Sequence, residues 1–373
     1  MIDLAIVGGG PAGLAVAIAA RQRLRLEVAV FERAAGPPRD KPCGEGLMPD
    51  GRAVLDELGV ELPFGAPFRG IRYWDGERAA TGFFPGTAGL GLRRTALHGA
   101  LVARARALGV DVHWGARVAG LRPDGLDTDQ GPVAARWVVG ADGLLSPVRR
   151  WAGLEGTRPR RAGRFGVRRH FAVQPWADVV EVYWADGAEA YVTPTGPEEV
   201  GIAILWSGAK ADFDTLLPRF PRLAARLAGA PTTSQDQGRG PLEQRVSGVA
   251  RGRLALVGDA AGYLDAITGE GLSLAFHQAL ALVTAIGEVD SGRATDLGGY
   301  ARAHRRIGRL PNLLTATLLA VERRPWLRRR MIQALAADPE LFSRLLGAHA
   351  RLLSPRELGL GTPLRLAWRL ATA

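Results

Sequence analysis

The segment from Asp3 to Glu32 carries the pattern that most restricts the possible fold. A short apolar run is followed by a glycine-rich turn, Gly8-Gly9-Gly10-Pro11-Ala12-Gly13, then by an alanine-rich helical segment and by a second apolar run that ends at Glu32. This order predicts the βαβ unit of a Rossmann-like domain. Gly8 permits the tight bend, Gly10 lets a pyrophosphate approach the backbone, and Gly13 lets helix and strand pack closely.

Glu32 is the acid that such a unit needs for a ribose. It follows the glycines by about 20 residues, where a carboxylate accepts hydrogen bonds from the ribose hydroxyls. An acid here favours an adenosine with a free 2′-hydroxyl, but it does not distinguish NAD from FAD. A plain NAD dehydrogenase with a single Rossmann unit is therefore one interpretation of this motif alone.

A second glycine-acid motif lies far along the chain. The apolar run Leu254–Val257 ends in Gly258-Asp259, and Thr268-Gly269-Glu270-Gly271 then precedes a long apolar segment. The pattern predicts a buried strand, a glycine-rich turn and a helix, with the Asp259 carboxylate at the helix N-terminus. Such a carboxylate can accept a sugar hydroxyl while backbone N–H groups face an anion.

A third motif stands between these two. Trp137-Val138-Val139-Gly140-Ala141-Asp142-Gly143 reads as a buried strand entering an Asp-Gly turn, followed by Ser146 and Arg149. With the other two motifs it resembles the p-hydroxybenzoate hydroxylase superfamily, which includes geranylgeranyl reductases and flavin-dependent halogenases. The resemblance implies FAD as cofactor, with NADPH or NADH as electron donor, acting directly or through a separate reductase.

The resemblance also implies which residues hold the cofactor. The first motif would bind the ADP part of FAD, the Gly-Asp motif the ribityl chain and pyrophosphate, and the Asp-Gly segment would lie near the pyrophosphate. The expected cofactor-binding residues are Gly8, Gly10, Pro11, Ala12, Gly13, Glu32, Arg33, Cys43, Gly44, Arg94, Val118, Asp142, Gly258, Asp259, Gly269, Gly271 and Leu272.

Within the superfamily, the loop Lys41-Pro42-Cys43-Gly44-Glu45-Gly46 looks like the Lys-Pro-Cys-Gly-Gly-Gly stretch of the geranylgeranyl reductases. Gly262 stands where aromatic hydroxylases more often have His. Two features depart from the reductases: Ala266 replaces their usual proline, and the region Tyr191–Pro194 lacks the Trp and Phe of their aromatic stretch. The halogenase Trp-x-Trp-x-Ile-Pro signature is absent from the sequence.

The predicted fold is α/β: a discontinuous Rossmann-like FAD-binding domain (1–68, 93–154 and 248–300), an inserted antiparallel β-sheet substrate domain (69–92 and 155–247) and a helical C-terminal region (301–373). Short β-branched and aromatic runs between turns predict the sheet. Asp212–Leu227 is predicted to form one helix against it. The aromatic residues expected to line an interdomain pocket are Trp74, Phe83, Phe84, Trp184, Tyr191 and Trp206.

The chemistry is expected to come from the flavin, with the protein supplying position and environment. Cys43, Tyr191, Tyr263 and Asp265 are the candidate catalytic neighbours of the ring, whereas His170 and His277 are read as structural. Because the prenyl-pocket aromatics are missing, we favour a monooxygenase acting on a lipophilic or aromatic metabolite of secondary metabolism. A double-bond reductase acting on a lipid or polyene is the close alternative, and a non-catalytic flavin-binding protein is a third.

Composition is consistent with a cytoplasmic enzyme. The single cysteine excludes an internal disulfide, no Cys/His spacing indicates a metal site, and neither a secretory signal nor a transmembrane segment is expected. The net charge is +11, and all basic residues except Lys41 and Lys210 are arginines. The arginine-rich C-terminal part could meet an acidic carrier protein or an anionic membrane surface. Nucleic-acid binding is not expected, because no aromatic residues are interleaved with these arginines.

Overall fold

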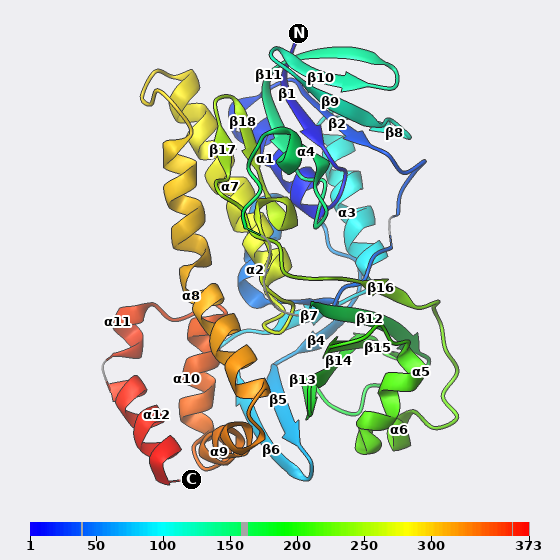
Figure 1. The fold of residues 1–373 in the computed structure, drawn as a ribbon, viewed down its shortest axis with the longest axis vertical. Coiled ribbons are helices and arrows are strands. Elements are labelled where there is room, and N and C mark those ends of the chain that lie inside the picture. Colours follow the sequence, from blue (N-terminus) through cyan, green and yellow to red (C-terminus); the bar gives the residue numbers. More distant parts are fainter. Residues whose placement is uncertain (39, 158–162, 360, 373) are drawn as a thin grey trace.

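The computed structural model describes residues 1–38, 40–157, 163–359 and 361–372. It combines a mostly parallel sheet with helices, a second and mostly antiparallel sheet, and a C-terminal set of helices that lies beside both (Figure 1). The predicted α/β class, with its Rossmann-like part, its antiparallel sheet and its helical C-terminal region, is confirmed.

The Rossmann-like part is built on an eight-stranded sheet. Its main path runs β17 (Ala250–Arg251), β18 (Leu254–Leu256), β11 (Gly131–Gly140), β1 (Ile2–Val7), β2 (Val28–Glu32) and β8 (Asp111–Trp114). From β18 to β8 all neighbours are parallel. Val7 pairs with Gly140, and Gly140 pairs with Leu256. The three predicted glycine-acid motifs therefore leave the same edge of the sheet side by side.

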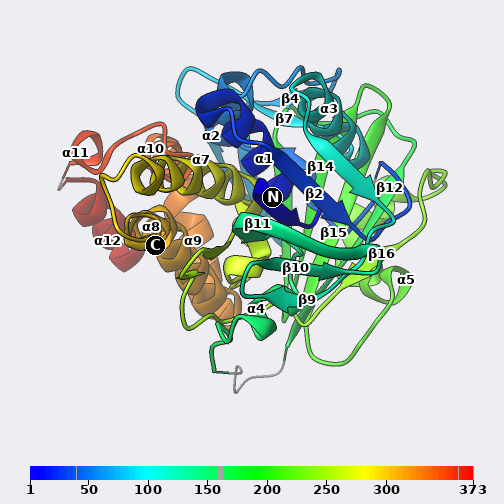
Figure 2. The same ribbon diagram turned by 90° about the horizontal axis from the view of Figure 1, so that it is seen from above.

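Helices cover this sheet and explain its apolar strands. α1 (Pro11–Leu24) is buried along most of its length, since Leu14 to Ala20 have no exposed surface. It contacts α3 (Arg94–Ala107) and α7 (Gly271–Asp290), and α7 in turn contacts α2 (Pro49–Glu57). A helix that is apolar on all sides must be enclosed in this way. Figure 2 shows α1 between the sheet and α7.

Two short strands extend the sheet beside the Asp-Gly motif. β9 (Val118–Arg122) and β10 (Gly125–Thr128) pair in antiparallel fashion, and β10 pairs with the first half of β11. The helix α4 (Pro147–Trp151) follows the Asp-Gly turn. β11 is thus longer than the strand expected from the sequence, because its N-terminal half belongs to this meander.

α7 has a mean hydropathy of 1.4, so by length and composition it could cross a membrane. The expectation that it is too polar to do so is therefore not supported by its hydropathy. In the folded chain, however, α7 lies between α1, α2 and α8 (Gly298–Glu322), which is the position of a core helix. Its apolar residues are accounted for by this packing.

The second sheet has seven strands in the order β16 (Gln237–Arg239), β12 (Arg164–Phe171), β15 (Glu199–Ser207), β14 (Ala188–Gly196), β13 (Val180–Ala185), β5 (Gly70–Asp75) and β6 (Arg78–Phe83). All described neighbours in it are antiparallel except β13 and β5, which are parallel. β5 and β6 come from the earlier segment of the chain, so this sheet joins two sequence-distant pieces.

The two faces of the seven-stranded sheet have different coverings. The outer face packs against α5 (Phe213–Leu216), the 3₁₀ helix η1 (Leu217–Arg219) and α6 (Pro221–Leu227). The single helix predicted here is wrong, because Pro218 and Pro221 each lack the N–H that a continuous helix needs. The inner face carries the alternate residues and looks toward the Gly-Asp motif.

A small three-stranded sheet fills the junction between the two larger ones. It consists of β3 (Gly46–Leu47), β7 (Gly89–Gly91) and β4 (Ala66–Phe68). Gly91 lies so close to β14 that a Cβ there would sit 1.8 Å from the Pro194 carbonyl oxygen. Only glycine fits this contact, which fixes the loop around Cys43 against the inner face.

The C-terminal helices connect both parts of the molecule. α8 runs from the Rossmann-like part to the seven-stranded sheet and is followed by α9 (Pro325–Ala336), α10 (Pro339–His349), α11 (Pro355–Leu358) and α12 (Gly361–Thr372) (Figure 1). Prolines open α9, α10 and α11, as expected for the first helical position. Pro311, in contrast, lies inside α8.

Candidate functional site

The candidate site is the edge of the eight-stranded sheet where the three motifs meet. Gly8 has φ +111°, and a Cβ there would lie 2.4 Å from the Ala141 carbonyl oxygen. Gly258 has φ +60°, and a Cβ there would lie 2.8 Å from the Ala12 Cβ atom. The first motif therefore touches both the Asp-Gly and the Gly-Asp segments, and the three turns lie around the open space at Gly10, which we call the groove.

The N-terminal turn has the shape of a phosphate cradle. Gly13 packs tightly, because a Cβ there would lie 2.0 Å from the Gly8 carbonyl oxygen. At Gly10, by contrast, a Cβ would meet no atom of the described residues within 4 Å. Gly10 is also the N-cap of α1, no side chain caps this helix, and Pro11 opens it. The free N–H groups of the first turn thus border open space, which suits an anion.

Glu32 lies at the end of β2, directly beside this turn. Its carboxylate accepts the Gly9 N–H at 2.9 Å and the Ala34 N–H at 3.0 Å. The Gly9 carbonyl in turn accepts a hydrogen bond from His98, which is fully buried on α3. The acid therefore helps to shape the turn, and its neighbour Arg33 is exposed.

Asp142 uses both carboxylate oxygens within its own segment. Oδ1 accepts the Ser146 hydroxyl and Oδ2 accepts the Val148 N–H at 3.0 Å, so Asp142 orders the start of α4. Burial raises the pKa of Asp142, and these hydrogen bonds oppose the rise. Arg149 spans the gap to the Gly-Asp motif, since its guanidinium donates to the Ala260 carbonyl at 3.1 Å.

Asp259 lies in a 3₁₀ helix, η2 (Gly258–Ala261), and α7 begins only at Gly271. The expectation that Asp259 caps the long helix is wrong, because the intervening turn separates the two and Glu270 occupies the N-cap position. Burial raises the pKa of Asp259, and positive charges on the surrounding loops oppose the rise. These charges belong to Lys41, Arg94, Arg239 and Arg149.

Glu270 is an unusual N-cap. It is 2% exposed, and neither carboxylate oxygen has a hydrogen-bond partner among the described residues. The nearest ring nitrogen, Nδ1 of His349, is 3.4 Å from Oε2, while His349 Nε2 donates to the Thr268 carbonyl. Burial raises the pKa of Glu270 to about 8. A neutral carboxyl here leaves the positive end of α7 available to a negative group in the groove.

The Cys43 loop closes the groove from the side of the second sheet. The Glu45 N–H contacts Cys43 Sγ at 3.4 Å, and the Glu45 carboxylate accepts the Arg94 N–H at 2.8 Å. Burial raises the pKa of the Cys43 thiol, and the nearby Arg94 charge opposes this. Cys43 is therefore a neutral thiol at neutral pH. Gly44, next to it, has open space where a Cβ would be.

Glu45 is held in the left-handed region, with φ +58°. This backbone conformation is unfavourable for a residue with a Cβ. Its carboxylate is also bonded to His170 Nε2, and His170 Nδ1 accepts the Arg168 guanidinium at 2.9 Å. Because arginine only donates, His170 Nδ1 accepts and Nε2 donates to Glu45. This chain anchors the loop to β12 and agrees with a structural role for His170.

The Gly-Asp turn also meets the inner face of the second sheet. The Tyr191 hydroxyl donates to the Ile267 carbonyl at 2.7 Å, and Tyr263 exchanges backbone hydrogen bonds with Gln244. The Tyr263 ring lies 3.6 Å from the Cβ position of Gly271. Both Asp265 oxygens are used, one by the Ile267 N–H and one by Arg164 at 2.9 Å.

An apolar cluster lies beside this turn. Leu144, Leu205 and Leu242 are buried together, with Tyr191, Tyr263 and Ala266 packed against them. Of the aromatic residues expected around a pocket, Trp184 and Tyr191 are on the inner face. Trp74 and Trp206 belong to the outer-face core, and Phe83 is 41% exposed, so for these three the expectation is wrong. Alternation along each strand decided the face.

The remaining predicted residues lie near the same groove or on its rim. Val118, which begins β9, and Leu272 each pack against the core of the Rossmann-like part. Gly269 is exposed, with φ +68°. The Glu45–His170–Arg168 chain was not expected from the sequence. Its signal was the spacing of Arg164, Arg168 and His170 on one strand, which alternation places on one face. Among the described residues, no group of three or more His, Cys, Asp or Glu side chains could hold a metal ion.

The geometry thus brings an anion cradle at the first turn of α1 and an apolar cluster at the Gly-Asp turn to the same edge of the eight-stranded sheet. The FAD binding domain family matches residues 1–306. The chain belongs to this family. The resemblance to the p-hydroxybenzoate hydroxylase superfamily is confirmed by this match, and FAD fits the open space at Gly10 and Gly44. The protein is an FAD-dependent oxidoreductase.

Similar proteins carry more than one activity. A menaquinone reductase of Mycobacterium tuberculosis is 29% identical over 304 residues, 72% of each chain. A 3-(3-hydroxy-phenyl)propionate/3-hydroxycinnamic acid hydroxylase of a Mycobacterium species is 29% identical over 325 residues, 79% of this chain and 55% of that longer protein. A solved flavoprotein/dehydrogenase from Cytophaga hutchinsonii has the same fold, with a TM-score of 0.85, 16% identity and full coverage of both chains.

Proposed function

We propose that this member of the FAD binding domain family is an NAD(P)H-consuming monooxygenase that acts on a lipophilic or aromatic small molecule. The observation that carries the proposal is the apolar cluster of Leu144, Leu205 and Leu242 beside the Gly-Asp turn. Bound FAD would supply the redox chemistry, accepting a hydride from NAD(P)H and activating dioxygen.

The chain's own residues would bind the cofactor and exclude water. The first turn of α1 and the open space at Gly10 would hold the pyrophosphate, and Glu32 and Asp259 would meet ribose and ribityl hydroxyls. The buried leucines, with Tyr191 and Tyr263, would keep the reacting atoms dry, which favours the transfer of oxygen over its loss to solvent. Tyr191 would position the turn, since its hydroxyl is committed to Ile267.

FAD binding is tested first, with Gly10→Val. Gly10 has φ −78°, which valine adopts, and its Cβ would enter open space, so the fold should survive while the cradle is filled. We expect FAD affinity to fall at least tenfold, which corresponds to about 1.4 kcal/mol. Gly99→Val is the matched control, because a Cβ there also meets no described atom within 4 Å but lies on α3. Equal affinity in both variants would contradict the proposed cradle.

The reaction is tested with two probes, 3-(3-hydroxyphenyl)propionate and menaquinone, which the names of the similar proteins suggest. Product that contains one oxygen atom from ¹⁸O₂, formed with NAD(P)H, supports the monooxygenase. Product that gains two hydrogens under anaerobic conditions would replace it with the second candidate below. NADH and NADPH are compared in the same assay, with and without a separate flavin reductase.

A double-bond reductase is the second candidate, and the Cys43 loop favours it. The loop places a neutral thiol beside Arg94 at the border of the groove, where a reduced carbon would need a proton donor. The menaquinone reductase among the similar proteins supports the same candidate. Cys43→Ser would then slow reduction of menaquinone by more than it weakens FAD binding. If neither probe stimulates the oxidation of NAD(P)H, the third interpretation, a flavin-binding protein without turnover, is favoured.

A further inference from the structure

The inner face of the second sheet contains a buried charge cluster that the proposed function does not use. Arg164, on β12, is bonded to the Glu189 carboxylate of β14 and to Asp265 at 2.9 Å, and Glu322 at the end of α8 lies 3.6 Å away. The Arg164 side chain is 5% exposed and the three acidic side chains at most 2%. Four segments distant in sequence thus converge on one guanidinium.

The charges in this cluster do not balance. One guanidinium faces three carboxyl groups, so full ionisation would leave net negative charge in a buried site, which is strongly unfavourable. Two oxygens, Glu189 Oε2 and Glu322 Oε1, have no hydrogen-bond partner among the described residues. A proton held by one of these carboxyls removes part of the excess charge, because like charges in close contact cannot all ionise.

The groups that face Glu189 favour its neutral form. Burial and the negative charges of Asp265 and Glu322 raise the pKa of Glu189 to about 8, against the opposing effect of Arg164. The titratable or charged side chains facing it from all packed elements are Arg164, Asp265, Glu322, Tyr191 and Tyr73. Burial also raises the pKa of Asp265. The arrangement therefore stores at least one proton at neutral pH.

A pocket of about 290 Å³ lies on the other side of the cluster. It is lined by Asp186, Gly187, Ser207, Glu322, Arg323 and Pro325. Two of these residues also meet Arg164: Ser207 through its hydroxyl at 3.5 Å, and Glu322. Asp265, on the opposite side of Arg164, belongs to the turn after Asp259. Arg164 thus connects the residues that line this pocket with the turn that follows Asp259.

We propose that the three carboxyls around Arg164 hold an exchangeable proton and supply it to the groove from the pocket beside Glu322. The inference rests on the proposed function only in assuming turnover of FAD with NAD(P)H. Monooxygenation and double-bond reduction each take one hydride from NAD(P)H and one proton from solvent. The O–H bond of Glu189 breaks, and its proton forms a new bond either to the oxygen that leaves as water in monooxygenation or to the second carbon in double-bond reduction. The resulting carboxylate is reprotonated from water through Glu322, so the cluster is unchanged after each turnover.

Glu189→Gln tests the stored proton directly, because glutamine has the shape of the neutral acid and cannot ionise. Infrared spectra of the FAD-bound protein without substrate should contain the carbonyl stretch of a neutral carboxyl, which shifts in D₂O and disappears as pH rises through about 8. In Glu189→Gln this band should lose intensity, and the part that remains should disappear when Glu270, whose pKa is also raised to about 8, is replaced by glutamine as well. Glu199→Gln, on the same sheet, is the control, because hydrogen bonds from Arg93, Thr195 and Thr233 outweigh burial and lower the pKa of Glu199 to about 2. Its removal should leave the band intact.

Glu322→Gln tests the route. Proton uptake from solvent, followed with a pH indicator after mixing with NAD(P)H and oxygen, should slow at least tenfold, in the range of general acid catalysis. Bleaching of the flavin by NAD(P)H should keep its rate, because hydride transfer needs no proton from the cluster. The pH profile of uptake should lose its decline above about 8 in Glu189→Gln.

The proposal is overturned if no neutral-carboxyl band exists, if Glu189→Gln leaves the band unchanged, or if proton uptake in Glu322→Gln matches the wild type. These results are distinguishable from a failure of the proposed function. A protein that binds FAD and oxygenates its substrate without the band refutes only the proton store. A protein with the band but without oxygen transfer refutes only the monooxygenase.

Discussion

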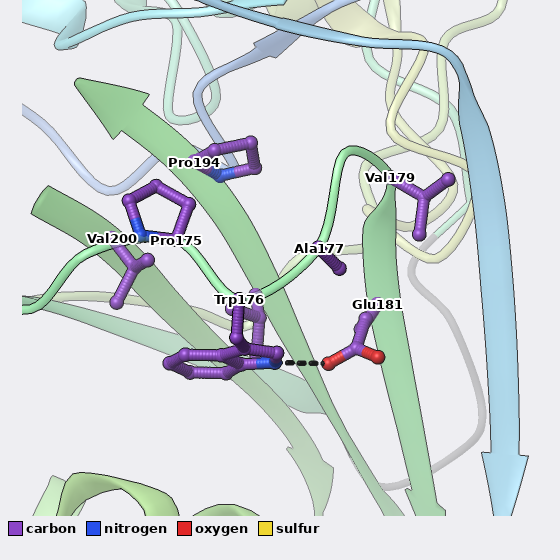
Figure 3. Close-up of a pocket in the computed structure, with 8 residues that line it drawn as sticks. Pro175, Trp176, Ala177, Val179, Glu181, Pro194 and Val200 are labelled. Atoms are coloured by element: carbon purple, nitrogen blue, oxygen red, sulfur yellow. Dashed lines mark hydrogen bonds between the residues drawn. The ribbon is translucent and has the colours of Figure 1, made fainter. Parts of the chain in front are cut away.

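Each face of the seven-stranded sheet buries one glutamate, and the two glutamates differ in their hydrogen-bond partners. On the outer face, Glu181 accepts hydrogen bonds from the indoles of Trp74 and Trp176 and from the Tyr183 hydroxyl, and it pairs with Arg72. Figure 3 shows the Trp176 bond beside a cavity of about 10 Å³, enough for about one water molecule. On the inner face, Glu189 shares one arginine with two other acids, and one of its oxygens has no hydrogen-bond partner in the part of the chain that the structure describes.

The difference teaches that burial alone does not set the charge of a carboxyl group. Burial opposes ionisation of Glu181, yet the hydrogen bonds of Trp176, Trp74 and Tyr183 lower its pKa. At Glu189 the charge and hydrogen bond of Arg164 do not offset burial and the two neighbouring acids, so the pKa of Glu189 is raised to about 8. Hydrogen-bond donors decide the outcome. On the outer face, hydrogen bonds stabilise the charged form of Glu181. On the inner face, Glu189 is a group that can change its charge near neutral pH.

The largest effect is expected from Arg164→Leu, which removes the only guanidinium that the three inner-face acids share among the described residues. Uncompensated buried charge should lower the free energy of unfolding by about 3–5 kcal/mol at pH 8. The loss should shrink at pH 5.5, which lies below the pKa of about 8 of Glu189. Urea unfolding at both pH values measures it, and an equal loss at both would contradict the excess negative charge.

Glu181→Ala should have the next largest effect. It leaves two indole N–H groups and a phenol without their acceptor, and we expect a loss of about 3 kcal/mol in unfolding free energy. Glu181→Gln keeps one acceptor oxygen and should lose roughly half as much. Equilibrium denaturation of both variants checks the ranking. If the alanine variant were as stable as wild type, the outer-face hydrogen bonds would not account for the low pKa.

The two faces should also respond to pH in opposite directions. The pKa of Glu189 is raised in the folded state. Its contribution to the free energy of unfolding is therefore complete below the usual pKa of 4.5 and is lost as pH rises toward about 8. The lowered pKa of Glu181 gives a contribution that is present above 4.5 and lost in acid. Between pH 5.5 and 7.5 a group of this kind should lower the free energy of unfolding of the wild type by about 2 kcal/mol. The change per pH unit is at most about 1.4 kcal/mol for each such group.

Glu189→Gln and Glu270→Gln should each remove a comparable part of this slope, since burial raises the pKa of both groups to about 8. Thermal denaturation of the wild type, the two single variants and the double variant across this pH range provides the measurement. A slope that persists in the double variant would place the titrating group elsewhere.

The smallest effect is expected at the outer surface. The Arg222 guanidinium lies 3.9 Å from the centre of the Trp74 ring, and its side chain is 35% exposed. Arg222→Ala should reduce stability by about 0.5–1 kcal/mol, the range for an exposed cation–π contact. Arg222→Lys, which keeps the charge, should restore part of it. A loss as large as that of Glu181→Ala would show that Arg222 orders the whole indole cluster.

Local patterns made the nucleotide-binding part of the fold predictable. Gly8, Gly10 and Gly13 are needed for backbone reasons that operate over a few residues, and the apolar strands follow from burial on both sides. Faces of the second sheet were harder to assign. Trp74 and Trp206 are apolar and aromatic like Trp184, and only the pairing register shows that they point to the outer core.

The sequence by itself determined that three glycine-acid turns exist, in the order that a flavin-binding Rossmann-like chain requires. It also contained each acid that the inner face collects. Only the tertiary structure decided that Arg164, Glu189, Asp265 and Glu322 share one buried site, because they come from two strands, a turn and the end of a long helix. Electrostatic energy depends on distance in space and on exclusion of water, and neither quantity is encoded by the spacing of residues along the chain.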